Sequence, residues 1–159
     1  MKGMTVIVKT ISSWVKILIF IFGIYIILFG HLSPGGGFPG GVILASSFIL
    51  LMLAFSRQEA EKYFPLSVAS KFDCIGALLF ILLALMGLGF GINAFFWNFL
   101  QQEYLAAHET VLKLISAGSI PLYNIFIGLK VCASLFLVIV VLSMTRPELP
   151  SEQEQHLEE

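Results

Sequence analysis

The hydrophobic residues fall into four long runs, and the polar residues gather mostly between them. The runs cover about residues 14–29, 38–55, 74–97 and 121–144. A bilayer core about 30 Å thick takes roughly 20 apolar residues as helix, because its interior offers no water to backbone polar groups. The pattern therefore predicts an all-α integral membrane protein with four transmembrane helices.

The composition supports this class and excludes several others. Of the 159 residues, 58% are hydrophobic and 12% are charged, and the mean hydropathy is +0.94. A soluble domain carries about 25% charged residues, so a soluble enzyme or a disordered chain is excluded. The net charge of −1 gives no field that would attract nucleic acid. Cys74 and Cys132 lie in apolar runs, and the sequence predicts no metal site, no cofactor and no catalytic activity of its own.

The basic residues predict the orientation of the helices. With a cytoplasmic amino terminus, seven of the nine lysines and arginines lie inside, one lies outside, and Lys130 lies within the fourth run. The inner group is Lys2, Lys9, Lys16, Arg57, Lys62, Lys71 and Arg146, and the outer residue is Lys113. The positive-inside rule then places both termini in the cytoplasm. We expect a membrane domain over residues 1–145 and a flexible, acidic cytoplasmic tail over 146–159.

Two further segments need an interpretation. Lysines before the first run are also typical of a signal peptide, but no Ala-x-Ala-like cleavage site follows, so we expect the first helix to be retained. Between the third and fourth runs, residues 98–119 form either an amphipathic helix at the membrane surface or an irregular loop. The sequence leaves both interpretations of this segment open.

A glycine-rich bend joins the first two runs, with the sequence Gly-His-Leu-Ser-Pro-Gly-Gly-Gly-Phe-Pro-Gly-Gly over residues 30–41. Its prolines restrict the backbone, and its glycines allow close approach of another helix. The candidate residues of the bend are Pro34, Gly35, Gly36, Gly37, Phe38, Pro39, Gly40 and Gly41. Gly35, Gly37 and Gly40 match the dinucleotide-binding pattern GxGxxG. A dinucleotide-binding site requires a preceding strand, however, and a membrane helix precedes this bend. The bend is therefore either a tight helical hairpin with a packing face or part of an ion path lined by free carbonyls.

This bend, followed by Val-Ile-Leu-Ala at 42–45, resembles the signature of the MnhB family, a small-subunit family of Mrp-type multisubunit Na+/H+ antiporters. The resemblance covers nearly the whole chain. It implies a small non-catalytic subunit in a prokaryotic cell membrane, assembled in the bilayer with other antiporter subunits. Related subunits recur in complex-I-like assemblies that contain hydrogenase-like or sulfur-reductase subunits. Stand-alone antiporter members commonly carry an acidic residue where this chain has Asn124, which favours the archaeal and hydrogenase-linked branch.

Lys130 lies about 13.5 Å along the fourth helix from Pro121, which is deep for an ammonium group. A charged lysine at mid-helix costs about 2.5–3.5 kcal/mol on insertion scales, and it requires a partner or a wet cavity. No carboxylate of this chain is expected at comparable depth, so we expect the partner to come from another subunit or from channel water. Lys130 then either conducts ions or ties subunits together.

Three other residues complete the set of ion-route candidates. His31 lies at the outer mouth, where it either serves the route or holds the bend. Asp73 lies at the inner mouth of the third helix, as its cap or as an ion entry, and Asn124 lies in the fourth helix. With no paired carboxylates and no chain of histidines, the protein is not expected to exchange ions alone. Two hypotheses follow: a subunit that helps to line the Na+/H+ route, or a purely structural assembly subunit.

Overall fold

The structure is a computed structural model that describes residues 4–32, 34–89, 94–98 and 117–145. The described residues form five helices and no strand, which confirms the predicted all-α class. Four of the helices are long and apolar enough to cross a membrane. The helices are α1 (Val6–Leu28), α2 (Gly37–Ala54), α3 (Arg57–Tyr63), α4 (Leu66–Gly89) and α6 (Ile120–Met144). Most of the 98–119 segment and the expected tail over 146–159 lie outside the described residues.

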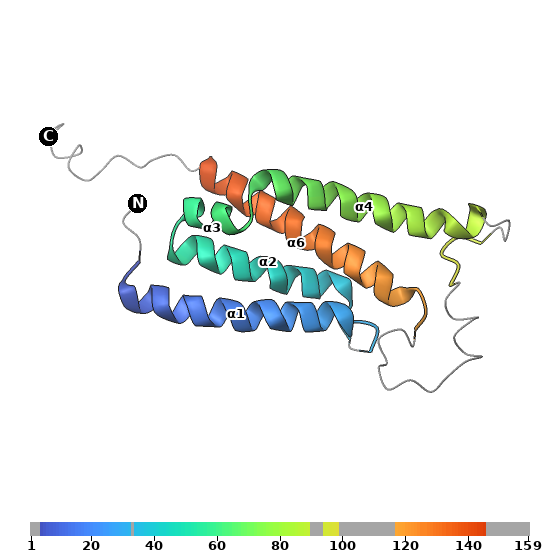
Figure 1. The fold of residues 1–159 in the computed structure, drawn as a ribbon, viewed down its shortest axis with the longest axis horizontal. Coiled ribbons are helices and arrows are strands. Elements are labelled where there is room, and N and C mark those ends of the chain that lie inside the picture. The colour runs from blue at the N-terminus through green and yellow to red at the C-terminus, as the bar shows by residue number, and fades with distance from the viewer. Residues whose placement is uncertain (1–3, 33, 90–93, 99–116, 146–159) are drawn as a thin grey trace, which may run out of the picture.

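The four long helices lie side by side and alternate in direction (Figure 1). α2 packs between α1 and α6, and α4 packs on the opposite side of α6. The short helix α3 connects α2 to α4 at the end of the bundle where α1 and α4 begin and where α6 ends. We call this end the α3 end, and the opposite end, which holds the glycine-rich bend, the bend end.

Two helices begin earlier than the hydrophobic runs suggested. α2 is shifted by one residue at both ends and α6 begins one residue early, but α1 begins at Val6 and α4 at Leu66, eight residues before the expected starts. α4 also ends at Gly89, eight residues before the expected end of the third span. In α4 the carbonyl of Pro65 accepts hydrogen bonds from the amides of Val68 and Ala69, at 2.9 and 3.0 Å, which starts the helix directly after the proline. Asp73 is therefore the eighth residue of α4, and the expectation that it caps the helix is wrong.

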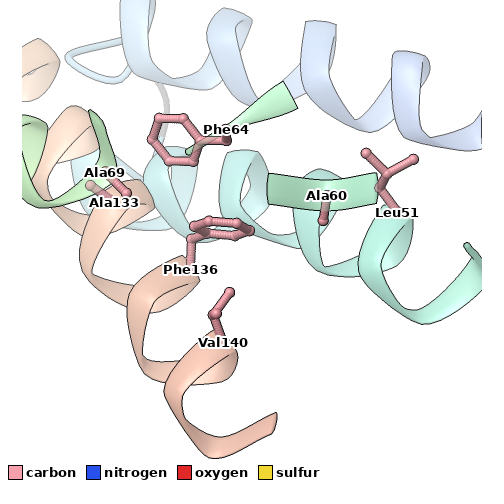
Figure 2. Packing of buried hydrophobic residues seen from close by; sticks show 7 residues of the cluster. All are labelled: Leu51, Ala60, Phe64, Ala69, Ala133, Phe136 and Val140. Carbon is pink, nitrogen blue, oxygen red and sulfur yellow. The ribbon is translucent and has the colours of Figure 1, made fainter. Parts of the chain in front are cut away.

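A hydrophobic cluster near the α3 end joins α2, α3, α4 and α6 (Figure 2). Its central side chain, Phe136 of α6, is fully buried, and its ring centroid lies 5.1 Å from that of Phe64 and 5.9 Å from that of Phe48. Phe64 follows α3 directly, so the short helix is fixed to the bundle through this side chain and through Ala60. The buried members are Leu51, Ala60, Phe64, Ala69, Ala133, Phe136 and Val140.

The outer faces of the bundle are apolar and open. α1 lies at one edge, where Trp14 is 74% exposed and Leu18 is 68% exposed. In a hydrocarbon environment such side chains cost nothing, since lipid tails are as apolar as leucine. The fold thus buries mainly small residues and a few large apolar ones between helices, and it leaves many large apolar residues, both aliphatic and aromatic, for lipid or for neighbouring chains.

Candidate functional site

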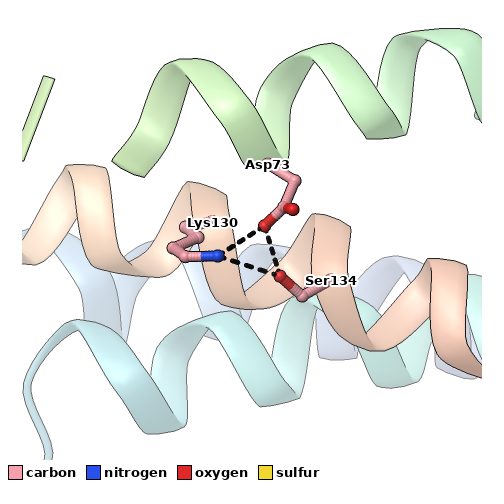
Figure 3. A network of polar contacts seen from close by, with 3 residues as sticks. All are labelled: Asp73, Lys130 and Ser134. Carbon is pink, nitrogen blue, oxygen red and sulfur yellow. Dashed lines mark hydrogen bonds and ion pairs between the residues drawn. The ribbon is translucent and has the colours of Figure 1, made fainter. Parts of the chain in front are cut away.

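A polar triad joins α4 to α6 (Figure 3). The ammonium nitrogen Nζ of Lys130 donates to Oδ1 of Asp73 at 2.7 Å. The hydroxyl of Ser134 donates to the same carboxylate oxygen, and Lys130 Nζ lies 3.5 Å from Ser134 Oγ. Lys130 and Ser134 are four residues apart and so share one face of α6. These three residues, Asp73, Lys130 and Ser134, are called the triad below.

A glycine lets the two helices approach closely beside the triad. A Cβ atom placed on Gly76 would lie 3.0 Å from Lys130 Cβ and 3.1 Å from the carbonyl oxygen of Phe126. Asp73 precedes Gly76 by three residues and so lies on the same face of α4. The short carboxylate therefore reaches Lys130 because no side chain at Gly76 holds the helices apart.

The triad lies well inside the helices that span the membrane. Asp73 is about 10.5 Å along α4 from Leu66, and Lys130 is about 15 Å along α6 from Ile120. This corrects two expectations from the sequence: a carboxylate of this chain does reach the depth of Lys130, and the partner of Lys130 within the chain is Asp73. The physical reason is the early start of α4, which carries Asp73 into the span.

The triad lies at the surface of the chain, in the seam between α4 and α6. The side chain of Lys130 is 44% exposed and that of Asp73 is 30% exposed. An ammonium group has three donors and a carboxylate has two oxygens. The contacts within the triad leave one Lys130 donor and Asp73 Oδ2 for other partners. Charges open to lipid tails are costly, so this surface requires water or another protein chain against it.

Asn124 occupies a separate position, at the bend end. Its Oδ1 accepts a hydrogen bond from the backbone N–H of Gly37, the first residue of α2, at 3.2 Å. The preceding residue, Gly36, has a φ of 72° and no side chain that could cap the helix. Asn124, 87 positions after Gly37 in the sequence, supplies the cap instead. The side chain is buried, and within the described part of the chain its Nδ2 has no hydrogen-bond partner.

The glycines of the bend pack against other helices of the same chain. A Cβ on Gly37 would lie 2.2 Å from the carbonyl oxygen of Asn124, and one on Gly41 would lie 2.7 Å from that of Gly128, so α2 and α6 meet backbone to backbone. Gly40 faces α1, where a Cβ would lie 2.5 Å from Ile27 Cγ1. The motif residues outside these contacts are Pro34, Gly35 and Phe38, which are exposed, and Pro39, which is half-buried.

The four ion-route candidates therefore lie in two places. Asp73 and Lys130 meet in the triad, whereas His31 lies in the turn after α1 and Asn124 lies against the start of α2, both at the bend end. Along α6, Asn124 precedes Lys130 by six residues, or about 9 Å. Sequence reasoning missed Ser134, although its spacing of four from Lys130 was a usable signal.

Comparison with known proteins gives a consistent set of matches. The family model described as "Domain related to MnhB subunit of Na+/H+ antiporter" matches residues 7–137. An uncharacterized protein of Methanocaldococcus jannaschii is 34% identical over 97% of this chain, and the chain spans 59% of that protein's length. A Staphylococcus haemolyticus protein named "Putative antiporter subunit mnhB2" is 32% identical over 90% of this chain and 97% of its own length.

A solved structure is similar as well. A chain in the structure of the membrane-bound sulfane sulfur reductase, an archaeal respiratory membrane complex, superposes with a TM-score of 0.70 and is 31% identical in sequence. The match covers 92% of the present chain and 60% of that chain. The sequence and structure comparisons thus agree over nearly the whole described fold.

Proposed function

The chain belongs to the family of the MnhB subunit of Na+/H+ antiporters, and on this premise we propose that it serves in an Mrp-type cation/proton antiporter module. It is a multi-pass protein of a prokaryotic membrane. Its neighbours are other antiporter subunits, and it performs no chemistry of its own. In a complex linked to a hydrogenase or a sulfur reductase, redox energy from the peripheral enzyme would drive ions through the membrane arm.

The α3 end of the bundle faces the cytoplasm in this proposal, and so do both termini. The support is the distribution of charge, since Lys9, Lys16, Arg57, Lys62 and Lys71 all lie toward this end. Basic residues favour the cytoplasmic side of membrane proteins. An even number of spans then brings the end of α6 back to the side on which α1 began.

The triad is the part of this subunit that contributes to the ion route, and its partly exposed position inside the span is the observation that carries this proposal. An ion pair held away from water is often no more stable than an apolar pair of similar volume, so stability alone does not account for the triad. Asp73 Oδ2 is an oxygen ligand for sodium or a proton acceptor. A cation arriving there competes with Lys130 for the carboxylate, so the pair can open and close as ions pass.

The alternative is a purely structural subunit, in which the triad only holds a neighbouring chain. The same exposure of Lys130 and Asp73 favours this role, because a neighbouring subunit would cover the charges equally well. The glycine contacts of the bend do not separate the two roles, since they join helices within the chain.

The test is the variant Lys130→Ala in the complete complex. Sodium-dependent collapse of a pH gradient is measured in everted vesicles, and assembly is measured by co-purification of the other subunits. We expect exchange to be lost while the complex still assembles. Lys62→Ala is the matched control, because Lys62 is 69% exposed on α3 and pairs only with Glu59 among the described residues. Wild-type exchange by Lys130→Ala would refute a role in the route, and parallel loss of assembly and exchange would favour the structural alternative.

A further inference from the structure

A cavity of about 230 Å³ opens between α1, α2 and the end of α3, away from the triad. Its walls are mostly apolar, and the lining residues are Lys16, Ile17, Phe20, Ser47, Phe48, Leu51 and Tyr63. The hydroxyl of Ser47 is already bonded to the carbonyl of Leu44 in its own helix. Among the described residues that line the cavity, Lys16 carries the single charge.

The ammonium group of Lys16 lies beside the end of α3. It lies 4.7 Å from the centroid of the Tyr63 ring, at the end of α3, within the range of a cation–π contact. α3 carries four charges in seven residues, with ion pairs between Arg57 and Glu61 and between Lys62 and Glu59. Such a helix belongs at the interface, not in hydrocarbon. The contact with Tyr63 thus places the positive charge of Lys16 at the level of α3, and Phe20 lies one helical turn farther along α1.

This positive charge is not neutralised within the described part of the chain. None of the described ion pairs includes Lys16. Lys9, on the same stripe of α1, also has no carboxylate partner there, and its ammonium lies 5.9 Å from the Phe55 ring. A second cavity, of about 310 Å³, adjoins Lys9 and Phe55. Two ammonium groups without a described carboxylate partner therefore lie beside hollows in the same half of α1, and of these the hollow beside Lys16 is the apolar one.

We propose that the cavity beside Lys16 is a binding site for an anionic phospholipid. The phosphate lies against Lys16 at the interface, and one acyl chain follows the apolar wall toward Phe20 and Phe48. Basic pockets between membrane helices on the cytoplasmic side favour acidic lipid headgroups. A lipid fits this cavity better than a protein side chain does, because a lipid has a charged headgroup for Lys16 at the membrane surface and an acyl chain for the apolar wall inside the bilayer. The site does not depend on any role of the triad in ion exchange.

The experiment uses the complete complex in vesicles made of equal parts phosphatidylglycerol and phosphatidylethanolamine. A photoreactive residue, p-benzoylphenylalanine, replaces Phe20 in the cavity or, as a control, Leu18, which is 68% exposed and lies off the cavity wall. After irradiation, mass spectrometry identifies the lipid or protein attached at each position. We expect the Phe20 position to capture phosphatidylglycerol in excess and the Leu18 position to capture both lipids in proportion to their abundance.

Variants of the lysine then test the headgroup contact. Lys16→Gln should lower the phosphatidylglycerol excess at the Phe20 position about fivefold, the loss expected for one basic residue at a membrane surface. Lys16→Arg should retain the excess, and Lys62→Gln, at the same end of the bundle, should leave it unchanged. Equal capture of the two lipids at both positions would overturn the proposal. So would an unchanged excess in Lys16→Gln, or an adduct with another subunit, which would mean that protein fills the cavity.

Discussion

Replacing Gly37 by alanine tests the contact between the start of α2 and the start of α6. The added Cβ would lie 2.2 Å from the carbonyl oxygen of Asn124 and 2.8 Å from its Cα. Both atoms belong to the backbone of α6, so no rotation of a side chain relieves the overlap, and the helices must separate. Overpacking of this kind costs about 1–3 kcal/mol. Separation also weakens the cap that Asn124 gives to Gly37 N–H.

The assay is thermal unfolding of the full chain in detergent micelles, followed by circular dichroism. For a chain of this size, each kcal/mol lowers Tm by about 2–4 °C, so Gly37→Ala should melt several degrees below the wild type. Gly89→Ala is the matched control, because a Cβ there meets no atom of the described residues within 4 Å, and its Tm should equal that of the wild type or exceed it slightly. Equal melting temperatures for the two variants would refute the close backbone contact.

Three further predictions concern the core, the cap and the orientation. Phe136→Ala removes a fully buried ring and should cost about 3–5 kcal/mol, seen as the largest fall in Tm among these variants; a fall smaller than that of Gly37→Ala would contradict the packing. Asn124→Ala removes the helix cap and should cost about 0.5–2 kcal/mol in the same assay; an unchanged Tm would mean that the cap contributes nothing. The variant Glu59→Cys, made in a chain that also carries Cys74→Ala and Cys132→Ala, tests the orientation. Its thiol should react with an impermeant reagent in everted vesicles and remain protected in intact cells. The reverse pattern would contradict the proposed orientation.

Much of the architecture was predictable from hydrophobicity alone. Four apolar runs gave the four spans because a membrane helix must satisfy its own backbone and expose apolar side chains. The depth of Lys130 followed from its position in the fourth run, and the glycine motif gave the family. These features depend on local sequence, which a single chain shows directly.

The partners of the polar residues were not predictable in the same way. The apolar residues of the third run mark only where hydrophobic sequence starts. The helix α4 starts earlier, at the first backbone hydrogen bonds after Pro65, and so it includes Asp73. The pairing of Asp73 with Lys130 also depends on the close approach of α4 and α6 at Gly76. The sequence around Gly76 does not indicate which helix packs against it. The contact between Asn124 and Gly37 is likewise tertiary, since it joins the start of α2 to the start of α6.

The central claim is that Asp73 and Lys130 act in ion exchange and do not only hold the complex together. Removing Lys130 alone leaves the Asp73 carboxylate with an uncompensated charge inside the span, which carries a free-energy cost of its own. The double variant Asp73→Asn, Lys130→Met removes both charges and avoids this cost. The decisive measurement is sodium/proton exchange per assembled complex in everted vesicles that carry this double variant. We predict normal assembly with exchange abolished; exchange at the wild-type rate would contradict the claim.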